Sequence, residues 1–212
     1  PLLLESSDKR LKRVLAATYC QRRLILELSR IAVWRRFQGT FLGVAWLLLK
    51  PLLFAVTYTL AVGVLLGVGD SIPDFPVYAL AGIVIWSYFS STVTGIQSSF
   101  TTHSQLLKNT RVEPLTAVLA SGLAVVPDLV IQTLIWILLG LALGASSVGL
   151  SLIAAPLFLV SIFLVALTAG IIIAVASLRI RDAVILVELS LQFGFWLVPI
   201  LWSVDFLNRI AN

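Results

Sequence analysis

Residues 35–68 read RRFQGTFLGVAWLLLKPLLFAVTYTLAVGVLLGV, and this stretch decides the fold class. An arginine pair precedes an apolar run from Leu42 to Val68 in which Lys50 is the only charged residue. A bilayer hydrocarbon core of about 30 Å requires about 20 apolar residues in a helix, so the run is long enough to cross a membrane. Because Lys50 and Pro51 lie near its start, the lysine side chain can reach the polar interface.

The same kind of run recurs along the rest of the chain. Runs of membrane-spanning length occupy residues 42–68, 77–98, 115–143, 150–178 and 183–202. The chain is 59% hydrophobic and 12% charged, whereas soluble domains average about 45–50% and about 25%. Its mean hydropathy is +1.05. We therefore predict an all-α polytopic integral membrane protein with five transmembrane helices and no strands.

Lysine and arginine are concentrated in alternate gaps between these runs. The gaps 69–76 and 144–149 contain neither residue, and only Arg209 lies beyond the fifth run. The basic residues of the other gaps are Lys108, Arg111, Arg179 and Arg181. Basic residues favour the cytoplasmic side of a membrane, so we expect a cytoplasmic N-terminus. This topology and attraction to lipid headgroups explain the net charge of +5, and we expect no nucleic-acid partner.

Residues 7–36 combine dense basic charge with a helical apolar stripe. The stripe consists of Leu11, Val14, Leu15, Thr18, Tyr19, Leu24, Ile25, Leu28, Ile31 and Ala32. An amphipathic helix of this kind lies in the headgroup plane of a membrane, with its basic face toward water. We predict one such interfacial helix over 7–36. The alternative is a helix that packs on a soluble partner.

Residues 99–113 form a polar second gap, and Pro114 follows at a position that suits the first turn of the next helix. Leu106 and Leu107 would give a short helix here a small apolar face, suited to docking a cytoplasmic protein. A solvated loop explains the composition equally well. His103 is the only histidine, and a single histidine cannot build a zinc site or a catalytic triad.

A motif at the entry to the first run and others along the chain point to a family. The segment RRFQGTFLG at residues 35–43 is followed by Trp46 and Pro51. Supporting motifs are FPVY at 75–78, AG at 81–82, WSYF at 86–89, LLKN at 106–109, RD at 181–182 and PI at 199–200. Together they resemble the type-2 ABC transporter permeases, closest to the branch that exports O-antigen, capsule or teichoic-acid polysaccharide. The segment TRVEP at 110–114 departs from the K-x-x-F-P pattern frequent in that branch.

The resemblance implies a half-channel of six transmembrane helices that pairs with a second copy as a homodimer. Two copies of a cytoplasmic ABC ATPase would dock beneath it and bind ATP and Mg, while this chain binds no cofactor. The sequence has no G-x-x-x-x-G-K-[ST] motif to cradle phosphates, so we expect a transport subunit and not an enzyme. Coupling to the ATPase is assigned to His103, Gln105, Leu106, Leu107, Lys108, Asn109 and Arg111.

Arg35, Arg36 and Gly39 are the expected headgroup contact or substrate entrance. An arginine pair can bind lipid headgroups or the phosphate of a lipid-linked substrate. A signal for topology alone is the alternative. Gly39 suits a sharp turn into the first transmembrane helix.

Polar and aromatic residues inside the runs are the candidates for lining a channel. Intramembrane carboxylates usually face a cavity or a partner, and aromatic rings either stack on sugars or mark the membrane interface. The candidates are Trp86, Tyr88, Phe89, Asp128, Gln132, Gln192, Phe193 and Trp196. For Asp128 the alternative is a hydrogen bond between helices.

The implied function is the permease subunit of an ATP-driven exporter that moves a lipid-linked polysaccharide across the bacterial cytoplasmic membrane. The alternatives are a type-2 ABC permease for a drug or small lipid, and a non-ABC membrane channel. A membrane enzyme is disfavoured because acid, base and metal-binding residues are few and scattered. Five runs in place of six, a start at Pro1 and the absence of methionine lead us to expect a longer natural chain.

Overall fold

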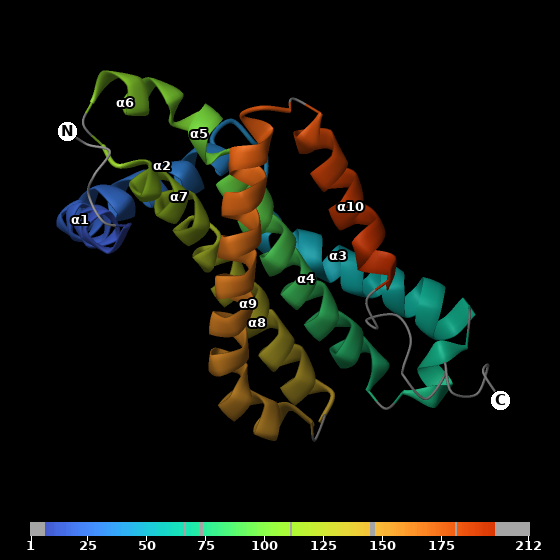
Figure 1. The fold of residues 1–212 in the computed structure, drawn as a ribbon. Coiled ribbons are helices and arrows are strands. Elements are labelled where there is room, and N and C mark those ends of the chain that lie inside the picture. The colour runs from blue at the N-terminus through green and yellow to red at the C-terminus, as the bar shows by residue number, and fades with distance from the viewer. Residues whose placement is uncertain are drawn as a thin grey trace.

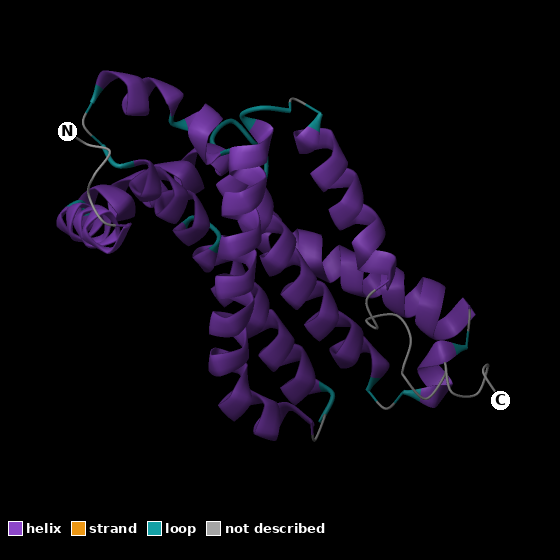
Figure 2. Ribbon diagram, viewed as in Figure 1, coloured by secondary structure: helices purple, strands orange, loops and turns teal. Residues whose placement is uncertain are grey.

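The computed structural model describes residues 7–65, 67–72, 74–110, 112–144, 147–180 and 182–197. Every regular element within these ranges is a helix (Figure 2), which confirms the all-α prediction. Four described segments are long and apolar enough to cross a membrane. They are Gly43–Leu65, Phe75–Gln97, Pro114–Ala142 and Leu157–Ser177. The described chain therefore has the fold of an all-α polytopic membrane protein.

The first membrane-length segment changes its helical pitch along its length. It consists of η2 (Gly43–Ala45), a 3-10 turn, then α3 (Trp46–Tyr58), then η3 (Thr59–Leu65), a π-helix. The run was expected to continue to Val68. Instead Gly67 adopts a left-handed φ of 68° and leads into a short 3-10 turn, η4 (Val68–Ser71). Glycine takes this conformation at little steric cost, so it ends the helix here.

The third membrane-length segment is divided into α7 (Pro114–Leu123) and α8 (Val126–Ala142). The sequence predicted a continuous helix over 115–143. Pro127 follows the break, and its ring lacks the N–H that would bond to the carbonyl of Leu123. The proline therefore allows α8 to begin as a new helix while the segment keeps its overall course.

The remaining long helices are α4 (Phe75–Gln97), α9 (Ser147–Ser177) and α10 (Ala183–Leu197). α10 is apolar, and its 15 described residues are fewer than a full membrane span requires. The predicted fifth helix extended over 183–202, and residues 198–202 lie outside the described part of the chain.

The N-terminal region forms two helices, α1 (Ser7–Cys20) and α2 (Arg22–Phe37), where one helix over 7–36 was expected. They meet at Gln21, with no proline or glycine at the junction. The Gln21 side chain instead binds the start of α7, where its Oε1 accepts hydrogen bonds from Thr116 and Glu113. The interruption thus coincides with a tertiary contact rather than with a helix-breaking residue.

The polar segment 99–113 is largely helical, and not the solvated loop that its composition also allowed. It contains α5 (Ser99–Thr102) and α6 (Ser104–Asn109). α5 continues from the C-terminal end of α4 and contacts α7, and α6 packs on α5 (Figure 1).

α4 is the central helix, and its most extensive contacts are with α9. The buried face of α9 presents small residues at four-residue spacing, namely Ala166, Gly170 and Ala174. A Cβ atom on Gly170 would lie 2.8 Å from Cβ of Ile96, itself fully buried on α4. Small residues let membrane helices approach closely and gain dispersion energy, so this stripe sets the α4–α9 distance.

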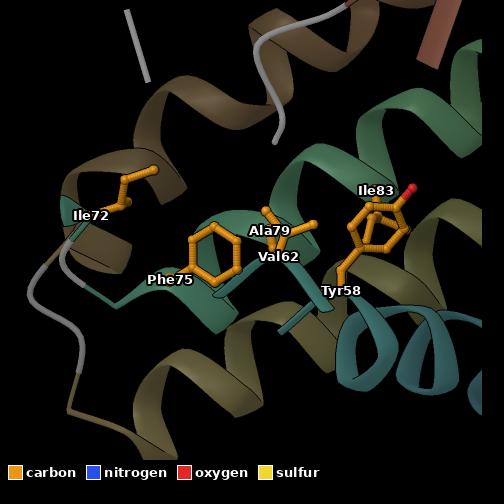
Figure 3. Close-up of a cluster of buried hydrophobic side chains, with 6 residues drawn as sticks. All are labelled: Tyr58, Val62, Ile72, Phe75, Ala79 and Ile83. Carbon is orange, nitrogen blue, oxygen red and sulfur yellow. The ribbon is translucent and has the colours of Figure 1, made fainter. Parts of the chain in front are cut away.

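A second contact joins the first membrane-length segment to the N-terminal half of α4. Figure 3 shows Tyr58 and Val62 beside Ala79 and Ile83, with Phe75 and Ile72 extending the cluster toward the connecting turn. A Cβ atom on Gly63 would lie 2.8 Å from the Phe75 ring. The ring therefore occupies the space that a larger residue in η3 would fill.

The connections between helices are sorted to two ends of the bundle. α5, α6 and the link from α9 to α10 lie at one end, and the α8–α9 and η4 turns lie at the other (Figure 1). Lys108 and Arg179 belong to the first end, and both are exposed. The charge asymmetry read from the sequence is thus an asymmetry between the two ends of the fold.

Candidate functional site

An ion pair joins the end of the N-terminal region to the third membrane-length segment. Nη1 of Arg36, in the last turn of α2, donates to Oδ2 of Asp128, in the first turn of α8, at 2.8 Å. The Asp128 side chain is 17% exposed and that of Arg36 is 37% exposed. A carboxylate at this depth needs a partner, and Arg36 supplies one from a helix 92 residues away.

The second oxygen of Asp128 has a different environment. Oδ1 is buried and has no hydrogen-bond partner among the described residues. An unpaired buried acceptor is costly. The carboxylate therefore retains capacity for another donor, supplied by a ligand or by water.

The ion pair forms part of the wall of a cavity of about 710 Å³ between α2, α3, α4 and α8. Its polar lining consists of Arg36, Thr40, Lys50, Ser87, Ser91, Asp128 and Gln132. Its larger apolar side chains are Phe37, Trp46, Leu47, Phe54 and Ile83. The cavity is thus a partly open pocket between apolar helices, lined by both polar and aromatic side chains.

Most of the cavity lining belongs to the membrane-length segments, while Arg36, Phe37 and Thr40 precede the first of them. Lys50 is in the first of these segments, Ser87 and Ser91 are in the second, and Asp128 and Gln132 are in the third. Its charges are two cations and one anion, so it has a positive balance. Such a pocket fits an amphiphile with an anionic, hydroxyl-bearing headgroup, because each part of that molecule finds a matching wall.

The structure brings together some of the predicted site residues and separates others. Asp128 and Gln132, predicted as channel lining, and Arg36, predicted as an entrance residue, line the same cavity. Arg35 is exposed at the end of α2, and Gly39 has a φ of 75° in the turn that follows. The alternative considered for Asp128, a hydrogen bond between helices, is therefore present and lies at a cavity.

The aromatic candidates do not line this cavity. Trp86 packs against Phe89 and against Phe195 of α10, with ring centroids 5.7 Å and 6.2 Å apart. Tyr88 is buried in this single chain, and its ring stacks on Phe163 of α9. These rings join α4 to its neighbouring helices.

The α10 candidates Gln192, Phe193 and Trp196 are all exposed on the described chain. α10 rests on α4 through Gly194, where an added Cβ would lie 2.9 Å from the Trp86 ring. The exposed face of α10 is therefore available to lipid or to another chain.

In the proposed coupling segment, Leu106 and Leu107 are half-buried, while Lys108 and Asn109 are exposed. Nδ1 of His103 lies 3.0 Å from the backbone oxygen of Ser99, in the preceding helical turn. The Gln105 side chain and Arg111 lie outside the described residues. The segment thus offers a polar outer surface at the basic end of the bundle.

Sequence reasoning missed several lining residues, including Thr40, Trp46, Ser87 and Ser91. The serines carried a signal, because two hydroxyls four residues apart lie on one face of a helix. The sequence around Gln21 gave no signal of its role, because its hydrogen-bond partners are more than 90 residues away.

Comparison with known proteins finds one matching family and three similar permeases that share one name. Residues 23–211 match the family described as ABC-2 type transporter. The O-antigen export system permease protein RfbA of Myxococcus xanthus is 28% identical over 198 residues, which are 91% of this chain and 73% of that protein. Two proteins of the same name from Klebsiella pneumoniae are 27% and 28% identical, and each match covers 80% of this chain.

The chain spans 65% of the length of the two Klebsiella relatives. The family match nevertheless extends over nearly all of this chain and includes all four membrane-length segments. This protein is therefore a multi-pass membrane protein that belongs to the ABC-2 type transporter family.

Proposed function

We propose that this chain is the permease subunit of an ATP-driven exporter that moves a lipid-linked polysaccharide across the bacterial cytoplasmic membrane. The observation that carries the proposal is its similarity over 80–91% of its length to permeases named for O-antigen export. The polar cavity within the membrane-length helices adds physical support, because a hydrophilic cargo needs such a lining. Family membership argues against a non-ABC channel.

The proposed subunit performs no chemistry of its own. A cytoplasmic ABC ATPase, in two copies, would bind ATP and Mg and dock on α5 and α6. Exposed Lys108 and Asn109 would contact it, with His103, Gln105, Leu106, Leu107 and Arg111 completing the docking segment. Because α6 packs on α5, and α5 contacts both α4 and α7, movement of the ATPase would reach the membrane-length helices through α5.

A second copy of the permease would complete the translocation pathway. The exposed α10 residues Gln192, Phe193 and Trp196, with neighbouring Trp86 and Phe89, would then lie along or near the surface between copies. Tyr88 would support α4 from the interior, because it is buried against α9. A homodimer is expected since one chain supplies only part of an enclosed channel.

The proposed orientation places the N-terminus and α5–α6 on the cytoplasmic side. The outer face of α1 and α2 would then lie among headgroups, where exposed Tyr19, Leu26 and Trp34 alternate with Arg22 and Arg30. Aromatic and basic residues together are typical of membrane interfaces. Arg35, Arg36 and Gly39 would form the entrance from this leaflet to the cavity.

The function is tested by deleting the gene in its host and measuring polysaccharide at the cell surface. Intracellular accumulation of polysaccharide, reversed by the full-length gene, is the expected result. Normal surface polysaccharide in the deletion strain would reject the proposal. Purification in mild detergent should recover an ABC ATPase at one-to-one stoichiometry, and removal of residues 105–111 should abolish its recovery.

A permease for a drug or small lipid is the second candidate. The cavity volume of about 710 Å³ lies within the range of small-molecule sites, about 300–1,000 Å³. Drug-stimulated ATPase activity of the reconstituted complex, with unchanged surface polysaccharide in the deletion strain, would favour this candidate.

A further inference from the structure

We propose that the cavity between α2, α3, α4 and α8 is a two-part binding site for a lipid-anchored phosphosugar. Arg36 and Lys50 bind the phosphate, and Ser87, Ser91 and Gln132 bind the hydroxyls of the sugar next to it. The inference rests on the proposed function for its substrate class. It assigns the recognition of the cargo's lipid-linked end to particular side chains of this permease.

The phosphate half is defined by the two cations. Arg36 uses Nη1 to bind Asp128, which leaves other guanidinium donors for a second acceptor. Lys50 is exposed and makes no ion pair with any described residue. Both side chains line one cavity, and arginine and lysine together match the charge and the acceptor oxygens of a phosphate.

Asp128 is the anionic partner with which a phosphate would compete. Its carboxylate holds Arg36 at the cavity wall. A phosphate would compete with the carboxylate for the same guanidinium, so binding replaces one anionic partner by another. This exchange keeps Arg36 paired with an anion at every stage.

The part of the site proposed to bind the sugar contains hydroxyls that make no hydrogen bond to the backbone of their own helix. Ser90 and Thr94 of α4 donate to backbone carbonyls of their own helix, as isolated hydroxyls in membrane helices commonly do. Ser87 and Ser91 also lie on α4 and line the cavity, and their hydroxyls make no hydrogen bond to a described residue. Gln132, one turn beyond Asp128, adds an amide with both donors and an acceptor.

The apolar walls account for the lipid anchor. Phe37, Trp46 and Phe54 line the same cavity, and the C–H face of a sugar or the first carbons of a lipid chain can pack on such rings. The volume of about 710 Å³ accommodates a headgroup and one or two sugars but not a polysaccharide. The site would therefore recognise the lipid-linked end of the cargo and leave the rest of the chain outside.

The test measures binding to the full-length protein in phosphatidylcholine nanodiscs by native mass spectrometry. Three matched probes are glucosyl farnesyl phosphate, farnesyl phosphate and farnesol, and free glucose 1-phosphate tests whether the lipid is needed. The affinity should be highest for glucosyl farnesyl phosphate, lower for farnesyl phosphate and lowest for farnesol. Glucose 1-phosphate should bind more weakly than its farnesyl ester, because it lacks the part that contacts the aromatic walls.

Variants then separate the two halves of the site. Lys50→Ala should weaken the binding of both phosphate lipids by about tenfold, the usual effect of losing a hydrogen bond to a charged group. It should not alter the binding of farnesol. The double variant Ser87→Ala with Ser91→Ala should weaken the binding of the glucosyl lipid only. Asp128→Asn should strengthen binding of both phosphate lipids, because Arg36 loses its competing anion.

Arg179→Ala and Ser90→Ala are the matched controls. Arg179 is an exposed cation in the link between α9 and α10, and Ser90 carries a hydroxyl on α4. Neither residue lines the cavity. The proposed site would be overturned by equal binding of the three lipids. Equal losses of affinity in Lys50→Ala and Arg179→Ala would also overturn it. Such a result would leave the export function standing if deletion of the gene still blocks surface polysaccharide. Selective binding combined with normal surface polysaccharide in the deletion strain would instead support the site and reject the export function.

Discussion

Oε1 of Gln21 accepts a hydrogen bond from the hydroxyl of Thr116 at 2.7 Å, and the two residues are 95 positions apart. The same oxygen accepts from the backbone N–H of Glu113 at 3.3 Å. Gln21 thus joins the junction of α1 and α2 to the point where the proposed coupling segment, residues 99–113, ends and α7 begins. Any displacement of α5 and α6 that moves the start of α7 must also move the N-terminal helices, or break these hydrogen bonds.

Gln21→Ala is expected to lower the thermal stability of the protein in detergent. The variant leaves the buried Thr116 hydroxyl without its acceptor, and an unsatisfied buried polar group costs about 1–3 kcal/mol. The unfolding midpoint, followed by intrinsic tryptophan fluorescence, measures the loss. Gln38→Ala is the control, because Gln38 is exposed at the other end of α2; equal midpoints for the two variants would contradict the prediction.

Arg36→Leu is expected to destabilise the fold more than the double variant Arg36→Leu with Asp128→Leu. The single change leaves a mostly buried carboxylate without its cation, at a cost of roughly 2 kcal/mol or more. The double change removes both charges, and apolar pairs often replace ion pairs with little loss. Unfolding midpoints of wild type, both single variants and the double variant complete the cycle. A double variant no more stable than Arg36→Leu would show that the pair is not an energetic unit.

Gly170→Leu is expected to disrupt the packing of α9 on α4. A Cβ at this position would lie 2.8 Å from Cβ of Ile96, and neither backbone-fixed atom can rotate away. The helices would have to separate, which removes dispersion contacts along the whole Ala166–Ala174 stripe. Val165→Leu is the control because Val165 is exposed on α9. Lower yield of monodisperse protein in size-exclusion chromatography for Gly170→Leu alone is the expected outcome.

Features that depend on local composition were predictable from the sequence. The central helix was expected over 77–98 and is found as Phe75–Gln97, because an uninterrupted apolar run between polar gaps leaves little choice. The separation of basic from non-basic gaps appears directly as two ends of the bundle. The helix break before Pro127 was also encoded in the sequence, although the apolar run had been read as continuous.

Features that depend on long-range contacts were not predictable. Arg36 and Asp128 were each identified, but as members of different sites, since nothing local links residues 92 positions apart. Tyr88 and Trp86 look alike as channel candidates in sequence, yet only the fold shows that Tyr88 is buried against α9. Residue type tells which side chains can contact a sugar, and packing decides which of them are exposed to one.

Lys108→Glu is expected to lower ATPase activity and transport of the assembled complex while membrane insertion remains normal. Lys108 is exposed in the last turn of α6, where reversed charge would repel an acidic docking surface. Arg111 is assigned to the same docking segment, so its charge reversal should have the same result. Lys12→Glu, an exposed charge reversal in α1, is the control. Coupled activity equal to wild type in Lys108→Glu would remove α6 from the docking surface.

Cysteine labelling tests the orientation on which the coupling assignment depends. Cys20 is exposed at the end of α1, and Leu143 is exposed in the turn between α8 and α9, at the opposite end of the bundle. In right-side-out vesicles a membrane-impermeant maleimide should not label native Cys20. It should label the variant Cys20→Ser with Leu143→Cys, whose added thiol is expected to face outward. In inverted vesicles the pattern should reverse, because the charge bias predicts a cytoplasmic N-terminal end. Labelling of Cys20 in right-side-out vesicles would put α5 and α6 outside the cell, where no ATPase has access to ATP, and the coupling assignment would fail with it.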